Sequence, residues 1–245
     1  MLAVAAATGC GRHKQTKVDV PPPPTISETE TESADNTPPV PIPPESSKPE
    51  AGSDALSVSP DTKAIFTETG VASWYGPPYH NRRGSNGEIY NMHALTAAHR
   101  TLPLGSIVRV TNLKTGNSTL VRITDRGPFI EGRIVDLSLA AAKKVDVWQA
   151  GLARVRVDVL KTPAPLETGG KWAVQIGGFD DHQSADKIAD HLTRKYRSAK
   201  VQRFASPTGD WWVRVRVKDD DKRRAQEVAQ TTETKQGSVF LVRLD

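Results

Sequence analysis

The sequence predicts two small folded domains after a long unstructured segment: a mainly-β barrel, then an α+β sandwich. Three observations lead to this fold class. Prolines and acidic residues concentrate in residues 11–69, strand-like alternation dominates residues 70–162, and strand and helix patterns alternate in residues 171–245. Residues 163–170, which contain Pro163, Pro165 and two glycines, form a linker between the two domains.

The overall composition excludes several classes of protein. The chain has 245 residues and a net charge of +5, and its single cysteine cannot close an intramolecular disulfide or build a multi-thiolate zinc site. No run reaches the roughly 18 apolar residues that a membrane-spanning helix needs. The histidines His80, His93, His182 and His191 lack ligand spacing, so we expect no metal site and no cofactor.

Residues 1–10 resemble a lipoprotein signal segment. An apolar run leads into Ala7-Thr8-Gly9-Cys10, with small side chains before the cysteine as a signal peptidase requires. The Cys10 thiol would then carry the lipid, and Gly11 does not match the usual signal for retention at the inner membrane. The alternative is a short buried helix with a free thiol.

Residues 11–69 are expected to form a disordered linker. They hold 11 of the 18 prolines, and 10 acidic residues against 5 basic ones. Proline removes backbone donors and polar residues offer little surface to bury, so no core can form. As a coil this segment spans roughly 45 Å, enough for an anchored protein to reach a distant target. A PxxP ligand is the alternative interpretation.

Residues 70–162 predict a barrel with one short helix. Strands are expected at 70–76, 107–111, 119–123 and 152–160, with a turn at 114–117. Asp136-Leu137-Ser138 can cap a helix over residues 139–143, and Asp136 is interpreted mainly as that cap.

Residues 171–245 predict a four-stranded antiparallel sheet with two helices on one face. Strands are expected at 172–176, 201–204, 211–217 and 239–244, and helical spacing follows Ser184, a candidate cap, and again Ala225. By alternation Trp212, Arg214, Arg216 and Gln175 face away from the helices. Such a face could stack on sugar rings or on RNA bases, or be a solvated edge.

Two carboxyls and an imidazole in the barrel suit acid–base work on a sugar bond. Asp125 ends an alternating strand before Gly127-Pro128, Glu88 follows a turn, and His99 ends a small apolar segment. Taken singly, Asp125 could form an Asx turn, Glu88 could be a solvated turn residue, and His99 could be a hydrogen-bonded packing residue.

The barrel motifs together resemble the double-psi β-barrel domain of the rare lipoprotein A (RlpA) family of septal lytic transglycosylases. The motifs are Ala72-Ser-Trp-Tyr-Gly76, Asn86-Gly-Glu88, Leu95-Thr-Ala-Ala-His99, Leu102-Pro-Leu-Gly105 and Asp125-Arg-Gly-Pro-Phe129. The resemblance implies Asp125 as the acid/base, with Glu88 and His99 in support. It places Trp74, Tyr75, Asn91 and Arg126 at the substrate. Many members carry Asp where this chain has Asn91, which can hydrogen-bond a sugar but holds no charge.

The last 75 residues resemble a SPOR domain, a module that binds glycan strands lacking stem peptides. The opening Val174-Gln-Ile-Gly-Gly-Phe179 carries the resemblance, and Lys218-Asp219-Asp220 departs from the usual Gly-Pro-Phe. It implies glycan contacts from Gln175, Phe179, Trp212, Arg214 and Arg216.

The resemblances together imply an endolytic peptidoglycan lytic transglycosylase. It would cleave the MurNAc–GlcNAc β-1,4 bond of denuded strands, leave 1,6-anhydroMurNAc ends, and act at the division septum from the periplasmic face of the outer membrane. The expected partners are septal glycan, the outer membrane through the lipid anchor, and the division machinery, but not nucleic acid. A wall-binding lipoprotein with a barrel that does not cut is the first alternative, and RNA binding through the C-terminal sheet is the second.

Overall fold

The computed structural model of the protein describes residues 56–245, except residues 57, 60 and 207. The predicted signal segment with Cys10, and the predicted linker up to residue 55, lie outside the described residues. The prediction that the linker extends to residue 69 is wrong at its end, because residues 66–69 pair with the last strand of the barrel. Within the part that is described, no helix is long and apolar enough to cross a membrane.

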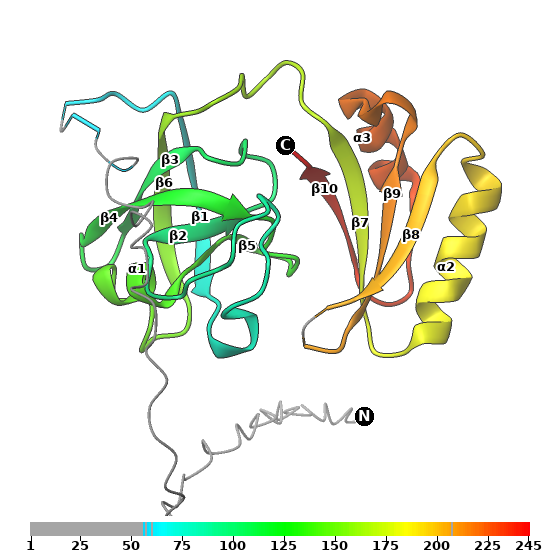
Figure 1. The fold of residues 1–245 in the computed structure, drawn as a ribbon, viewed down its shortest axis with the longest axis horizontal. Helices are drawn as coiled ribbons and strands as arrows, with labels where there is room; N and C mark the ends of the chain where they lie inside the picture. Colours follow the sequence, from blue (N-terminus) through cyan, green and yellow to red (C-terminus); the bar gives the residue numbers. More distant parts are fainter. Residues whose placement is uncertain (1–55, 57, 60, 207) are drawn as a thin grey trace, which may run out of the picture. The chain divides into compact units, whose positions relative to one another are not determined.

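The first folded domain is a closed β-barrel (Figure 1). Its described strands are β1 (Phe66–Trp74), β2 (Thr96–His99), β3 (Ile107–Asn112), β4 (Ser118–Asp125), β5 (Arg133–Leu137) and β6 (Ala153–Lys161). They pair in the order β1-β5-β2-β4-β3-β6, and β6 returns to pair with β1. The β1–β5 and β2–β4 pairs are parallel and the other pairs are antiparallel, so the predicted mainly-β barrel is confirmed.

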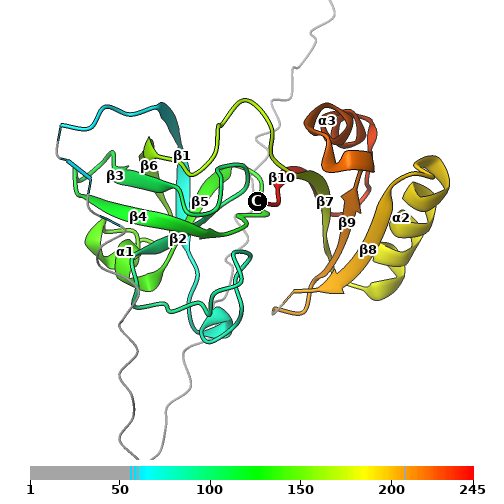
Figure 2. The same cartoon turned by 45° about the horizontal axis from the view of Figure 1, so that its top comes forward.

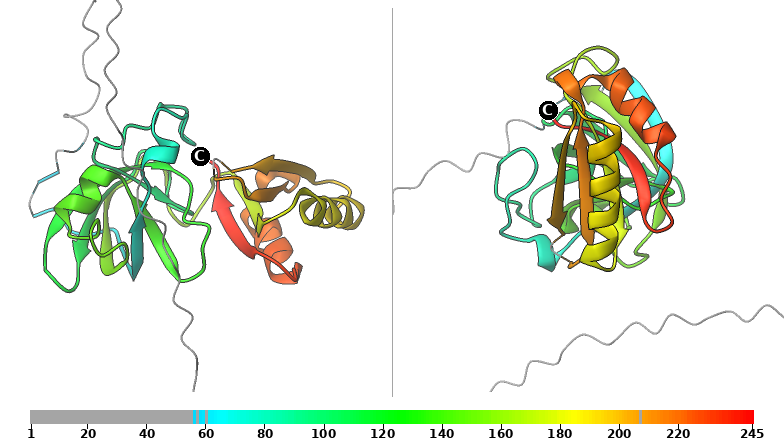
Figure 3. Two further views of the ribbon diagram at one scale, coloured as in Figure 1. Left: turned by 90° about the horizontal axis from the view of Figure 1, so that it is seen from below. Right: turned by 90° about the vertical axis from the view of Figure 1, so that its right-hand side faces the viewer.

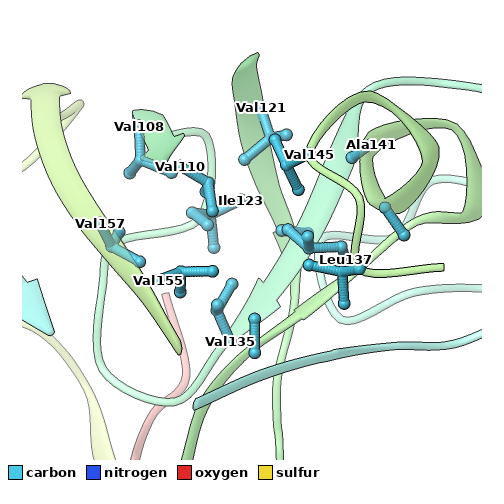
Figure 4. Close-up of a cluster of buried hydrophobic side chains, with 14 of the residues drawn as sticks. Val108, Val110, Val121, Ile123, Val135, Leu137, Ala141, Val145, Val155 and Val157 are labelled. Atoms are coloured by element: carbon cyan, nitrogen blue, oxygen red, sulfur yellow. The ribbon is translucent and has the colours of Figure 1, made fainter. Parts of the chain in front are cut away.

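The barrel core is made by alternate residues of its strands. Val108, Val110, Val121 and Ile123 are fully buried, and Figure 4 shows them pointing into one cluster with residues of β5 and β6. Burying such side chains is worth about 1.5–3 kcal/mol each relative to full exposure, so this row contributes to the stability of the barrel.

The prediction that Asp136 caps the helix is wrong. The helix α1 (Leu139–Lys144) begins after Ser138, whose hydroxyl accepts a hydrogen bond from the Ala141 amide at 3.2 Å. Asp136 lies inside β5, between the buried residues Val135 and Leu137. β5 is only five residues long and contains Arg133 and Asp136 beside three apolar residues. The sequence therefore shows no clear strand alternation there.

The second folded domain is a four-stranded antiparallel sheet with two helices on one face (Figures 1 and 2). Its strands are β7 (Trp172–Phe179), β8 (Lys200–Ala205), β9 (Trp211–Arg216) and β10 (Ser238–Arg243), paired in the order β10-β7-β9-β8. The helices α2 (His182–Lys195) and α3 (Lys222–Thr231) cover the sheet, as the right-hand view of Figure 3 shows for α2. Asp181, not Ser184, caps α2 by accepting a hydrogen bond from the Ser184 amide.

Phe179 does not lie on the sheet face that was predicted to bind glycan. It is 1% exposed and packs in the core beneath the helices, with Val213 and Leu192. The pairing of β7 with β9 shifts register between Gly177 and Phe179, because Gly177 and Gly178 both take positive φ and form a bulge. The bulge turns the ring to the opposite face from the one that simple alternation gives.

Candidate active site

Asp125 stands at the rim of the barrel, where β4 ends. Its Oδ1 accepts hydrogen bonds from the Ser85 amide at 3.0 Å, the Ser85 hydroxyl at 2.5 Å and the Arg126 amide at 2.8 Å. Its Oδ2 accepts no hydrogen bond from the residues that the structure describes. One oxygen therefore orients the carboxyl, and the other is left for a ligand.

A cavity of about 510 Å³ opens beside Asp125. This volume lies within the range of roughly 300–1,000 Å³ that is usual for sites that bind small molecules, so part of a glycan can enter it. The barrel residues of its lining are Tyr75, Tyr79, Arg82, Arg83, Gly84, Ser85, Tyr90, Ala98, Asp125, Arg126, Gly127, Pro128, Phe129, Ile130, Arg133 and Asp136.

Asp136 is a second carboxyl in the lining of the same cavity. The Ser73 hydroxyl donates a hydrogen bond to its Oδ1, and Arg133 Nη2 lies 3.5 Å from its Oδ2. Burial nevertheless raises the pKa of Asp136, because the loss of hydration outweighs the lowering by Arg133 and Ser73. A carboxyl that holds its proton more firmly is suited to donate it.

Three tyrosines form one wall of the cavity. The rings of Tyr75 and Tyr90 stack with centroids 4.3 Å apart, and Tyr79 meets Tyr75 edge-on at 5.8 Å. The Tyr90 hydroxyl donates to the Tyr75 carbonyl at 2.8 Å, which fixes the stack. Burial raises the pKa of both Tyr75 and Tyr90, so their hydroxyls stay protonated as neutral hydrogen-bonding groups. This wall can pack against the apolar faces of sugar rings.

Glu88 and Asn91 line a smaller neighbouring cavity of about 150 Å³, which Asp125 also borders. Glu88 accepts a paired hydrogen bond from the Arg122 guanidinium at 2.9 and 2.7 Å. That interaction lowers the pKa of Glu88, which keeps this carboxylate charged. The Asn91 Oδ1 accepts from the His93 amide at 2.9 Å.

The structure does not bring His99 to either cavity. Its ring is buried, its Nδ1 accepts from the amides of Thr101 and Leu102, and its Nε2 lies 3.1 Å from Glu68 Oε2. Because Nδ1 is an acceptor, the proton is on Nε2 and the ring donates to Glu68. Burial lowers the pKa of His99, which favours the neutral ring. These contacts are those of a packing histidine.

Arg126 follows Asp125 and turns its guanidinium inward. Nη1 donates to the carbonyls of His99 at 3.0 Å and Leu102 at 2.7 Å, and Nη2 donates to the main-chain oxygen of Asp245 at 2.7 Å. Burial lowers the pKa of Arg126 to about 10, but it remains charged near neutrality. Its geometry fixes the backbone that carries Asp125.

The remaining predicted substrate contacts divide into two groups. Gln175, Trp212 and Arg214 line the 510 Å³ cavity together with the barrel residues. Trp74 packs against the barrel core and lines neither cavity, and Arg216 pairs with Asp220, with Nε at 3.0 Å from Oδ1.

Asp136, Tyr79 and Tyr90 are functional candidates that the sequence argument missed. For Asp136 a signal is present in the sequence Ile134-Val-Asp-Leu137, where a single carboxyl sits between apolar neighbours. Such a pattern in a short strand indicates a charged residue on the face opposite the core. Among the residues that are described, no group of three or more His, Cys, Asp or Glu side chains could hold a metal ion.

Comparison with known families identifies both folded domains. Residues 67–157 match the family model described as lytic transglycolase. Residues 168–243 match the model of the SPOR domain. Each of the two folded domains therefore matches one family model, the first of the lytic transglycolase type and the second of the SPOR type.

Several curated relatives of this chain are named endolytic peptidoglycan transglycosylase RlpA. The chain is 58% identical over 102 residues to RlpA of Vibrio cholerae serotype O1, which covers 42% of this chain and 39% of that protein. It is 55% identical over 145 residues to RlpA of Neisseria meningitidis serogroup A, which covers 58% and 57%. The chain thus spans about half the length of these relatives, and the resemblance to the RlpA family is confirmed.

Among solved structures, one match is a mutant expansin of Clavibacter michiganensis in complex with cellohexaose. It covers 73% of this chain and 90% of its own, with a TM-score of 0.33 and 14% identity.

Proposed function

We propose that this protein is an endolytic peptidoglycan lytic transglycosylase. It cleaves the MurNAc–GlcNAc β-1,4 bond of peptide-free glycan strands and leaves a 1,6-anhydroMurNAc end. The observation that carries the proposal is that two carboxyls in unlike environments, Asp125 and Asp136, line one cavity beside a wall of tyrosine rings.

The two carboxyls suit the two proton transfers of this reaction. Asp136, whose pKa is raised, donates its proton to the glycosidic oxygen as the bond from that oxygen to C1 breaks. The C6 hydroxyl oxygen of MurNAc then bonds to C1, and its proton passes to the free Oδ2 of Asp125. No water is consumed, and exchange with solvent restores both carboxyls. In the simpler scheme that the family resemblance implies, Asp125 carries out both transfers.

Glu88 and His99 support Asp125 in different ways in this proposal. Glu88 borders the second cavity and can hold a sugar hydroxyl there, together with Asn91. His99 acts on the fold, through Glu68 and through its own carbonyl, which accepts from Arg126.

The location of the protein is also proposed. Lipidation at Cys10 would anchor it at the periplasmic face of the outer membrane, and the SPOR domain would concentrate it on denuded glycan at the division septum. The relatives named as peptidoglycan transglycosylases and the SPOR match support a site of action in the cell wall. Contact with the division machinery is a further expectation.

The test is a digest of peptide-free glycan strands by the purified chain, analysed by mass spectrometry for 1,6-anhydro ends. We expect products from the unchanged protein and a loss of at least about 100-fold for Asp125→Asn and for Asp136→Asn. Glu131→Gln, which removes an exposed carboxyl outside both cavities, is the matched control and should retain activity.

The outcomes separate the candidate mechanisms and functions. Full activity of Asp136→Asn with loss in Asp125→Asn would assign both proton transfers to Asp125. Binding to the strands without any 1,6-anhydro product from the unchanged protein would favour the alternative, a wall-binding protein whose barrel does not cut.

A further inference from the structure

We propose that Arg214 of the SPOR domain reads the free lactyl carboxylate of a MurNAc residue inside the cleavage cavity, and so selects peptide-free strands at the bond that is cut. This inference rests on the proposed function. It assigns to the catalytic cavity a specificity residue that comes from the second domain.

The cavity that contains Asp125 and Asp136 is completed by the SPOR sheet. Gln175 of β7, Phe204 of β8 and Arg214 of β9 line it opposite the barrel residues. Substrate that reaches the two carboxyls therefore also meets this face of the sheet.

Direct contacts join the two domains next to the cavity. Phe129, four residues after Asp125, packs with its ring centroid 5.4 Å from that of Trp212 and 5.8 Å from that of Phe240. The Arg243 amide donates to the Arg100 carbonyl at 3.0 Å. Trp212 is 7% exposed as a result, so the indole predicted to stack on a sugar packs with Phe129 instead.

Arg214 is held in place but retains unused donors. Its Nε and Nη2 donate to Gln175 Oε1 at 3.3 and 2.8 Å, and its guanidinium carbon lies 5.1 Å from the centroid of the Phe204 ring. Nη1 donates to no atom of the described residues. A guanidinium fixed on an amide and an aromatic ring loses little freedom when it binds a planar carboxylate.

The electrostatics of the cavity favour an anionic ligand. The lining holds five arginines and three aspartates: Arg82, Arg83, Arg126, Arg133 and Arg214 with Asp125, Asp136 and Asp210. Burial and the charge of Arg216 lower the pKa of Arg214, and the charge of Asp125 acts in the opposite direction. Arg82 and Arg83 are exposed, Arg126 is committed to carbonyl oxygens and Arg133 pairs with Asp136. This leaves Arg214 as the ordered guanidinium that can bind a ligand carboxylate.

The chemistry of the substrate supplies a matching group. In a strand with stem peptides the lactyl group of MurNAc ends in an amide, whereas removal of the peptide leaves a carboxylate. A charged hydrogen bond to that carboxylate would be lost with the amide. Arg214 thereby distinguishes denuded from substituted glycan by charge as well as by bulk.

The experiment compares two preparations of the same peptide-free strands, one with free lactyl carboxylates and one coupled to methylamine through carbodiimide. For the unchanged full chain we expect a preference of about 10- to 100-fold in kcat/KM for the free carboxylate. Arg214→Ala should bring this ratio close to one. Gln175→Leu, which removes the acceptor that orients Arg214, should reduce the ratio partially.

Arg203→Ala is the matched control. Arg203 lies on the neighbouring strand β8, pairs with Asp186 and lines neither the 510 Å³ cavity nor the 150 Å³ cavity. The ratio should therefore stay at the value of the unchanged protein. Thermal unfolding of each variant verifies that it is folded. Equal rates on the two substrates, or a preference that survives in folded Arg214→Ala, would overturn the inference while the proposed function stands. Absence of products from both substrates with the unchanged protein would instead overturn the proposed function.

Discussion

Ser73 and Asp136 are register partners in the parallel pair of β1 and β5, and the Ser73 hydroxyl donates a hydrogen bond to Asp136 Oδ1. The strand pairing thus places the donor directly beside the Asp136 carboxyl of the cavity. This hydrogen bond favours the ionised form, so it lowers the pKa of Asp136 against the stronger opposing effect of burial.

Ser73→Ala is therefore expected to raise the pKa of Asp136 further. The loss of the hydrogen bond should also cost about 1 kcal/mol of unfolding free energy. Titration of the Asp136 carboxyl carbon by NMR measures the first effect, and urea unfolding measures the second. Ser85→Ala, which removes a donor to Asp125, is the control. A downward shift at Asp136 in Ser73→Ala would contradict this account.

Asp136→Asn should change how stability depends on pH. The folded-state pKa of Asp136 lies above its ordinary value of 3.8, so the folded protein binds the proton more tightly than the unfolded chain. The stabilisation that this gives is present at low pH and is lost as the pH rises through the folded value. Asparagine cannot titrate, so the variant should gain stability relative to the unchanged protein across that interval. Urea unfolding over a pH series measures the difference, and a difference that stays flat would contradict the assignment.

His99→Gln should destabilise the barrel by about 2–4 kcal/mol, because the ring's three buried hydrogen bonds are not all replaced. Burial lowers the pKa of His99 from its ordinary value of 6.5. Its contribution to stability is therefore present above that value and is lost as the pH falls below it. The variant should lack this acid-dependent loss in urea unfolding experiments. If His99 acts in the chemistry, activity would instead disappear at temperatures where the variant is still folded.

Phe179→Ala should destabilise the SPOR domain by about 3–5 kcal/mol, since it removes a fully buried ring from the core beneath the helices. Phe179→Leu keeps most of the volume and should cost less. Denaturant unfolding monitored by tryptophan fluorescence separates these values. A Phe179→Ala variant of normal stability that no longer binds glycan would restore the role predicted from the sequence.

Regular alternation is the part of this structure that the sequence predicts well. Val108 and Val110, or Val213 and Val215, define a core face by parity alone, and both domains were predicted from such rows. Prediction fails where local backbone geometry changes the parity. The bulge at Gly177-Gly178 turns Phe179 inward. The strand β5 has only five residues, which is too few for alternation to predict a strand.

The sequence predicts only part of the candidate site, because the rest depends on contacts between distant segments. Asp125 is visible because it ends a long strand before Gly127-Pro128. The residues that lie near Asp125 in space depend on which strands pair. β1 and β5 are far apart in the sequence and pair in parallel, so no local motif predicts that they are neighbours. His99 contacts Glu68 of β1 and does not line the cavity. Neither the motif around His99 nor its spacing predicts this contact.

The position of β1 in the barrel has a consequence for the order of assembly. β1 lies between β5 and β6, with Ala72 opposite Val135 on one side and Phe66 opposite Val159 on the other. The strand that begins the domain therefore completes its pairing with the strand that ends it. Such distant contacts form late in folding, because a long loop must close first. A chain that has emerged only as far as residue 152 leaves β1 and β3 with open edges, which are prone to pair with other chains. The cavity with its two carboxyls thus becomes complete only after the whole barrel sequence is present.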